Sequence, residues 1–210
     1  MEPTGALDFL SRVVSFHPRD YCRLQPEDKP AAFTIPGVDS LAVIEMIQRE
    51  LLVSLRDGET FSMFYRRSLV HFARALVTPP GRFRLERLFH TTIGCAYSAG
   101  RAAQLLDGAV RVALPWWQYR AVGDSLTRAT HAALDGLVAR WDDPVWRKFY
   151  PPNGPGCRCK VVALLTSQAR ELAGEDLDTP ALERLPRSLS VRFAHTVLPF
   201  VTGERPFLRR

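Results

Sequence analysis

Residues 115–164 read PWWQYRAVGDSLTRATHAALDGLVARWDDPVWRKFYPPNGPGCRCKVVAL and decide the fold of this 210-residue chain. The stretch concentrates tryptophans and turn-forming Pro and Gly residues. It also carries a Cys-x-Cys pair, Cys157 and Cys159, directly after a loop of prolines and glycines. His131 lies 26 residues upstream of the first cysteine. This composition is typical of a compact, turn-rich module whose short strands are positioned by specific side chains.

The spacing of apolar residues changes where this module begins. Residues 109–114 alternate between apolar and other side chains, and a short helix capped by Thr127 is expected over 127–134. Three strands are expected, at 117–122, 137–141 and 159–165. The module therefore predicts a small antiparallel sheet.

Upstream of the module, apolar residues recur at three- and four-residue spacing, which predicts helices. Three helices are expected, at 39–57, 60–76 and 84–106. The first begins at Asp39-Ser40 and ends at Asp57-Gly58, which are ordinary start and stop signals. The third carries small residues, including Gly94 and Gly100, which would let another backbone approach closely.

The two ends of the chain have less regular patterns. Residues 5–14 are amphipathic, and residues 17–37 are rich in Pro and charge, which favours an arm or linker. After the sheet, Thr166 or Ser167 could cap a last short helix that ends near Ala173. The sequence predicts an α+β fold in which a helical N-terminal half packs on a small antiparallel sheet, with extended N- and C-terminal arms. The expected division is an N-terminal arm (1–38), a core (39–165) and a C-terminal tail (166–210).

Composition places the chain among soluble globular proteins, with 46% apolar and 24% charged residues. No apolar run approaches the roughly 18–20 residues that a membrane span requires, so no membrane partner is expected. The first residues, Met1 to Thr4, lack the basic and apolar regions of a secretory signal. We therefore expect the protein to be made in a bacterial-type cytoplasm.

The positive charge is unevenly placed. Residues 81–165 carry 12 basic and 6 acidic side chains, so the whole net charge of +6 falls on the segment that contains the module. Moderate positive charge suits nearby nucleic acid or an acidic protein surface, and does not choose between them.

The cysteines and the histidine of the module form a candidate metal site. Residues two apart on a strand face the same side, so Cys157 and Cys159 could both point toward His131. Zinc accepts such a set of ligands, and Asp124 or Asp135 could supply a fourth. The alternative is that the cysteines are small buried residues at a tight junction and that His131 bonds a backbone carbonyl or Asp135. If zinc is bound, we expect a structural role for it.

Other residues of the module are expected to hold its turns. Arg128 and Asp124 could form an ion pair, which Arg101 and Arg158 could join unless they face DNA. The loop over 151–156 is expected to be rigid and to fix the angle at which the last strand enters. Core packing is expected of the four tryptophans, Trp116, Trp117, Trp141 and Trp146.

Three blocks of sequence resemble the Mu F-like minor head proteins, the phage head-morphogenesis family. The first block lies within residues 88–101, the second within 119–136, and the third, which ends in Cys157-Arg158-Cys159, within 143–159. The resemblance covers roughly residues 60–165, and the three blocks follow one another in the order that the family has. The third block is the most specific.

The resemblance implies a structural minor head protein of a tailed bacteriophage, located in the virion at the head interior or the portal vertex. It implies the portal protein and the major capsid protein as partners, with packaged DNA as a third candidate. No serine elbow, paired glutamates or phosphate-cradling glycine loop is found, so we expect no enzymatic activity. The alternative is a metal-dependent nuclease or hydrolase that acts during DNA packaging or ejection through His131 and the cysteines.

Overall fold

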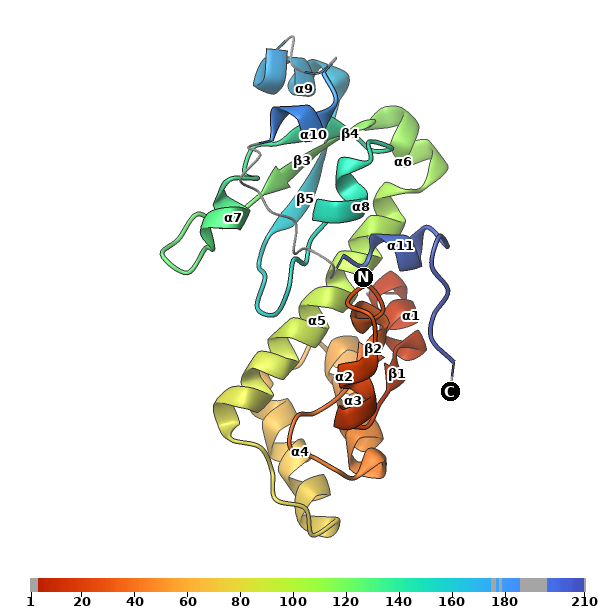
Figure 1. Ribbon diagram of the computed structural model, residues 1–210, viewed down its shortest axis with the longest axis vertical. Helices are drawn as coiled ribbons and strands as arrows, with labels where there is room; N and C mark the ends of the chain where they lie inside the picture. The colour runs from red at the N-terminus through yellow and green to blue at the C-terminus, as the bar shows by residue number, and fades with distance from the viewer. Residues whose placement is uncertain (1–3, 175–176, 178, 186–195, 210) are drawn as a thin grey trace.

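The computed structural model describes residues 4–174, 177, 179–185 and 196–209. A long helix, α5 (Arg82–Leu105), runs through the molecule and joins its two ends (Figure 1). Helices α3 (Leu41–Asp57) and α4 (Phe61–Arg74) pack beside its first half, and the three-stranded sheet lies toward its other end. The expected α+β fold is confirmed, and all three helices of the N-terminal half form where helical spacing predicted them.

Helix α3 (Leu41–Asp57) has both of the end signals that the sequence indicated. The Ser40 hydroxyl accepts a hydrogen bond from the Val43 amide at 3.4 Å, and Gly58 ends the helix with a left-handed backbone at φ 66°. Its buried apolar residues, among them Ile44, Ile47 and Leu51, face α4 (Phe61–Arg74) and α5. The pair of caps explains why this helix is the easiest element to predict.

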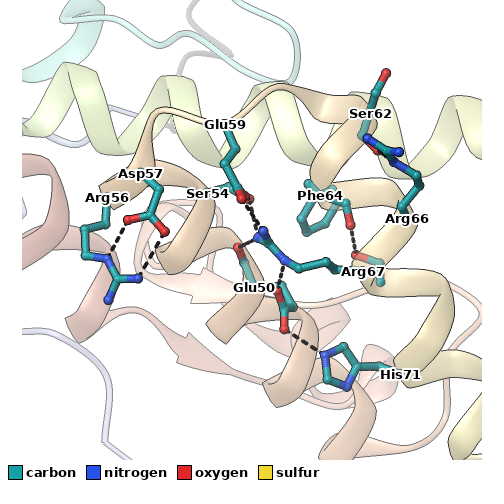
Figure 2. A network of polar contacts seen from close by, with 11 residues as sticks. Glu50, Ser54, Arg56, Asp57, Glu59, Ser62, Phe64, Arg66, Arg67 and His71 are labelled. Carbon is teal, nitrogen blue, oxygen red and sulfur yellow. Dashed lines mark hydrogen bonds and ion pairs between the residues drawn. The ribbon is translucent and has the colours of Figure 1, made fainter.

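A polar network joins α3 to α4, and Figure 2 shows it from close by. The Arg67 guanidinium donates to Glu50 at 2.5 Å and also to Glu59, and it lies 3.1 Å from the Ser54 hydroxyl. His71 contacts the other Glu50 oxygen at 2.7 Å. Because all these side chains are at least half-buried, the network fixes how the two helices sit against each other.

The N-terminal segment differs from the extended arm that was expected for residues 1–38. It folds into α1 (Thr4–Arg12), α2 (Pro18–Arg23), a 3₁₀ turn (Lys29–Ala31) and a parallel two-stranded ribbon, β1 (Val14–Ser15) with β2 (Ala32–Phe33). Phe33, Ile35 and Val38 are buried in the main core. The prolines of this segment therefore mark turns between packed elements, because apolar residues between them reach the core.

Helix α1 crosses α5 at very short range, as the small residues of α5 predicted. A Cβ atom added at Gly100 would lie 2.7 Å from the backbone nitrogen of Ala6, and one added at Gly5 would lie 3.1 Å from Gly100. Gly94, by contrast, has nothing within 4 Å of such an atom. Only one of the two glycines is thus needed for the close approach.

The sheet has the order β4-β3-β5, with β3 antiparallel to both neighbours. Its strands are β3 (Trp116–Arg120), β4 (Val138–Arg140) and β5 (Lys160–Leu164), so all three expected strands are confirmed. Trp117 and Trp146 are completely buried, with ring centroids 5.6 Å apart, whereas Trp116 and Trp141 are only half-buried. Trp146 comes from α8 (Val145–Phe149), which covers one face of the sheet.

In this half, one sequence pattern was misleading and one expectation, the helix over 127–134 capped by Thr127, was wrong in its extent and its cap. Residues 109–114 alternate in character but form α6 (Gly108–Ala113), because the Asp107 carboxylate accepts hydrogen bonds from the Ala109 and Val110 amides and starts a helix there. The helix after the first strand is shorter than expected, α7 (Ala129–Ala132). Thr127 does not cap it; its hydroxyl contacts Asp124 and the Gly123 amide instead.

The C-terminal segment is also packed where the structure describes it. The last predicted helix is present as α9 (Thr166–Ala173), with Leu165, rather than Thr166 or Ser167, at its N-cap position. Two further short helices follow, α10 (Ala181–Arg184) and α11 (Leu198–Val201). Phe207 then packs on Phe9 with ring centroids 5.5 Å apart. The tail that was expected to be extended therefore packs on α5 and α8 through α11 and on α1 through Phe207. The part of it expected over 186–195 lies outside the described residues.

Within the described ranges, we find no helix that combines the length and the hydrophobicity of a membrane span.

Candidate metal centre

His131 sits at the end of the short helix α7 and faces the start of β5. Its side chain is buried, with 3% of its surface exposed. The ring atom Nδ1 lies 3.7 Å from Cys157 Sγ and 3.4 Å from Cys159 Sγ. One ligand atom from each of the three residues can be chosen so that all lie within 4.8 Å of one another. The three residues chosen from the sequence are therefore brought together.

The loop before β5 sets the position of both thiols. It contains a cis peptide bond between Pro151 and Pro152, and positive φ angles at Gly154 and Gly156. The Gly156 amide donates to the Thr91 hydroxyl of α5 at 3.2 Å, and Cys157 N donates to the Gly154 carbonyl. Both cysteines lie before the first residue of β5, so the tight turn, and not strand alternation, aims them at His131.

Two buried residues, Asn153 and Tyr119, hold this loop in place, and neither was predicted from the sequence. Asn153 is 4% exposed, and its amide nitrogen donates to the Tyr119 hydroxyl at 3.1 Å and to the Phe149 carbonyl at 2.9 Å. Burial, then a hydrogen bond with Cys159, raises the pKa of Tyr119. The sequence did contain a signal for Asn153: it is a polar residue flanked on both sides by Pro and Gly. If the amide of such a residue is buried, it needs hydrogen-bond partners.

The two thiols differ in their ease of ionisation. The hydrogen bond from Cys159, partly opposed by burial, lowers the pKa of Cys157 to about 5. The same contact, together with burial, raises the pKa of Cys159. The contact between the two thiols therefore favours ionisation of Cys157 over that of Cys159, and thiolate is the form that binds metal.

Arg128 contacts the other side of the histidine ring. Its guanidinium donates to the carbonyl oxygens of Pro155 at 2.5 Å and Asn153 at 3.5 Å, and it lies 3.5 Å from His131 Nε2. A guanidinium can only donate, so Nε2 accepts and the ring proton lies on Nδ1, toward the sulfurs. Arg128 thus ties helix α7 to the loop before β5.

The predicted ion pair between Arg128 and Asp124 was wrong, because a different arginine binds that carboxylate. Arg158 makes a bidentate pair with Asp124 at 2.6 and 2.7 Å. This hydrogen bond, against a small opposing effect of desolvation, lowers the pKa of Asp124 to about 2. Arg158 lies between the two cysteines in sequence, and its guanidinium is bound to Asp124.

Neither carboxylate that was expected as a fourth ligand joins the cluster. Asp124 is bound to Arg158, and Asp135 accepts from the Ala121 amide at 2.8 Å and lies 3.8 Å from Arg120. Among the described residues, the cluster consists of His131, Cys157 and Cys159 alone. A cavity of about 380 Å³ borders all three and is also lined by Arg87 and Arg128.

The fold and the cluster both lie within a segment that defines a known class of bacteriophage proteins. The family described as Phage Mu protein F like protein matches residues 45–162, from α3 to β5 and including His131 and both cysteines. This match covers more than half of the chain. The chain belongs to the Phage Mu protein F like family, as the sequence resemblance indicated.

Two curated relatives agree with this assignment. The putative capsid assembly protein F of Escherichia phage Mu is 44% identical over 67% of this chain and 35% of its own length. The Mu-like prophage FluMu F protein of Haemophilus influenzae is 48% identical over 39% of this chain and 19% of its own length. The chain thus spans about a third or less of the length of the curated relatives it matches. No solved structure matches it.

Proposed function

We propose that this chain is a minor structural protein of a tailed-bacteriophage head, and that it acts by binding other head components during capsid assembly. The observation that carries the proposal is its membership of the Phage Mu protein F like family. A relative that is similar over two thirds of the chain is named a putative capsid assembly protein. The mechanism is the formation of contacts, with no bond broken or formed.

The partners we propose are the portal protein and the major capsid protein, with packaged DNA as a third. The protein would then lie inside the head or at the portal vertex, after assembly in the cytoplasm of the bacterial host. Support comes from the charge excess of residues 81–165 and from a run of exposed arginines on α5, Arg82, Arg84, Arg87 and Arg101. Exposed guanidinium groups suit acidic protein surfaces and phosphate groups alike.

The test uses phage particles in which the gene for this protein is intact or interrupted. We expect purified heads to contain the polypeptide at low copy number and to cross-link it to the portal or the major capsid protein. We expect the interrupted gene to reduce the yield of filled heads. Mature heads that lack the polypeptide, together with an unchanged yield from the interrupted gene, would refute the proposal.

We infer that His131, Cys157 and Cys159 bind a structural zinc ion. In a tetrahedral site with Zn–S of about 2.3 Å and Zn–N of about 2.0–2.1 Å, sulfur and nitrogen ligands lie about 3.6 Å apart. The observed Nδ1–Sγ distances of 3.4 and 3.7 Å lie on either side of that value. The buried imidazole and the easily ionised Cys157 thiol also fit the donor set that zinc prefers.

In this arrangement the chain's own residues do the positioning, and the zinc supplies a cross-link between α7 and the loop before β5. Arg128 holds the loop by a hydrogen bond to the Pro155 carbonyl, and Asn153 holds it by a hydrogen bond to the Tyr119 hydroxyl. The cavity that borders the three residues would leave room for a further zinc ligand, of which water is the simplest.

The arrangement of side chains around the cluster does not support the alternative of a metal-dependent nuclease. The two carboxylates that could have served as a base beside a metal, Asp124 and Asp135, are held by Arg158 and by the Ala121 amide. We therefore expect supercoiled DNA to remain intact with the zinc-loaded protein. Cleavage that disappears in His131→Ala would favour the enzyme instead.

A further inference from the structure

A second cavity lies on the other side of Arg87 and Pro155 from the metal cluster. It is an apolar groove of about 470 Å³ between the β2 segment and the first half of α5, and we call it the β2 groove. Phe9, Phe33, Ile35 and Leu85 contribute apolar surface to it, and Phe83 lines it with 71% of its own surface exposed. Apolar cavities of this size that are bordered by an exposed aromatic ring are often binding sites.

One wall of the β2 groove is a strand edge. Strand β2 belongs to a two-stranded ribbon, and within the part of the chain that the structure describes it pairs with β1 alone. The Phe33 carbonyl accepts from the Phe16 amide at 2.7 Å, so the main chain of Phe33 faces β1. By the alternation of a parallel ladder, the carbonyl of Ala32 and both main-chain groups of Thr34 lie on the opposite edge. Ala32 and Thr34 both line the groove.

The same wall holds an unsatisfied polar atom. Thr34 Oγ1 is buried and, among the described residues, has no hydrogen-bond partner. Buried hydroxyls are nearly always bonded, so this atom is available to a polar group that enters the groove. A ligand with main-chain amides or carbonyls would supply one.

The rim of the groove is basic. Its charged lining residues are Lys29, Arg84 and Arg87, and among the described residues that line it there is no Asp or Glu. A ligand with carboxylates near its apolar part is therefore complementary, because it meets three cations and no like charge.

We propose that the β2 groove binds an extended segment of another protein chain, which adds to β2 as a third strand. This segment has an aromatic or large aliphatic side chain that enters the groove and an Asp or Glu beside it that meets the basic rim. Its main chain pairs with Ala32 and Thr34, and its backbone or a side chain bonds the Thr34 hydroxyl. Strand addition gives affinity through main-chain bonds, and the pocket gives specificity. This interaction does not depend on the metal site.

The test is selection of linear peptides from a random display library against the purified full chain. We expect the enriched peptides to combine an aromatic or large aliphatic residue with Asp or Glu. Arg84→Glu/Arg87→Glu should weaken their binding by about tenfold or more, since two favourable charges become repulsive. The matched control Arg74→Glu/Arg170→Glu, which makes the same change of net charge at exposed positions outside the groove, should leave the affinity within about twofold.

Two further measurements separate strand addition from other ways of filling the groove. Thr34→Val should weaken the selected peptide about three- to tenfold without lowering the thermal stability of the free protein, because the hydroxyl has no partner there. N-methylation of alternate peptide residues should abolish binding at every second position only. Any one of three results would overturn the proposal. The first is that no peptide family is enriched, and the second is that the enriched peptides bind the groove variants as tightly as the wild-type protein. The third is that dodecanoate displaces the peptide while the N-methyl series shows no alternation.

Discussion

His131 Nδ1 lies 3.4 Å from Cys159 Sγ, although the two residues are 28 positions apart in the chain. On its other side, His131 Nε2 lies 3.5 Å from the Arg128 guanidinium. The histidine ring thus lies between the Arg128 guanidinium, which stays protonated and can only donate, and the sulfur atoms of Cys157 and Cys159. This placement determines where the ring proton must be in each state of the site.

We predict that zinc switches the tautomer of His131. Without metal, the proton is on Nδ1, because Nε2 accepts from Arg128. Zinc bound at Nδ1 moves the proton to Nε2 and breaks the contact with Arg128. Long-range ¹H–¹⁵N correlation spectra of the imidazole, recorded with chelator and with zinc, distinguish the two states. The same tautomer under both conditions would count against zinc binding at Nδ1.

We predict that Arg67 is the main polar link between α3 and α4. Arg67→Met leaves Glu50 and Glu59 without their shared donor, so the free energy of unfolding should fall by about 1–3 kcal/mol. Arg66→Met is the control on the same helix: Arg66 is exposed, and its loss should change stability by less than about 0.5 kcal/mol. Urea unfolding measures both. Equal effects of the two variants would show that the network contributes little.

The same network predicts a loss of stability in acid. Burial acts to raise the pKa of Glu50, but hydrogen bonds from His71 and Arg67 outweigh it, so the pKa lies below its usual value of 4.5. The folded state therefore gains stability from the ionised carboxylate above about pH 4.5, and loses it as the pH falls through the lower folded pKa. Glu50→Gln should flatten this part of the stability profile between pH 6 and 3. Glu59, whose pKa is also lowered, keeps some dependence in the variant. Identical profiles for the two proteins would contradict the assignment.

We predict opposite effects for two glycines of α5. Gly100→Ala should destabilise the protein by about 1–3 kcal/mol, because the new methyl group meets the backbone of Ala6 at 2.7 Å. Gly94→Ala should instead stabilise it by up to about 1 kcal/mol, since the site is open and alanine favours helix. Thermal unfolding of the two variants is the measurement. A stabilised Gly100→Ala protein would mean that α1 does not cross α5 at this point.

Some elements could be predicted from the sequence because their signals are local. Ser40 and Gly58 define α3 by capping, and the three strands were found by their alternation. The segment 109–114 was misleading because one carboxylate, that of Asp107, supplies a helix cap that outweighs an alternating pattern. The packing of residues 17–38 was missed because the apolar residues there are separated by prolines and show no period.

The candidate site was predicted in part for the same physical reason. His131, Cys157 and Cys159 could be chosen by residue type, because zinc limits the possible ligands to a few side chains. The partners of the charged residues could not be chosen this way. Arg158 and Arg128 are equally able to bind Asp124, and only the turn before β5 decides that Arg158 does so. Asn153 and Tyr119 are neighbours only in the folded chain.

The zinc content of the purified protein tests the central structural claim most directly. We expect about one zinc per chain in the wild-type protein and in Cys22→Ala, a control that removes an exposed thiol far from the cluster in sequence. We expect almost none in Cys157→Ala/Cys159→Ala, with a lower melting temperature. Chelation should lower the melting temperature of the wild-type protein to a similar extent. A wild-type protein with no more zinc than the double variant, and with a melting temperature that chelator leaves unchanged, would contradict the account.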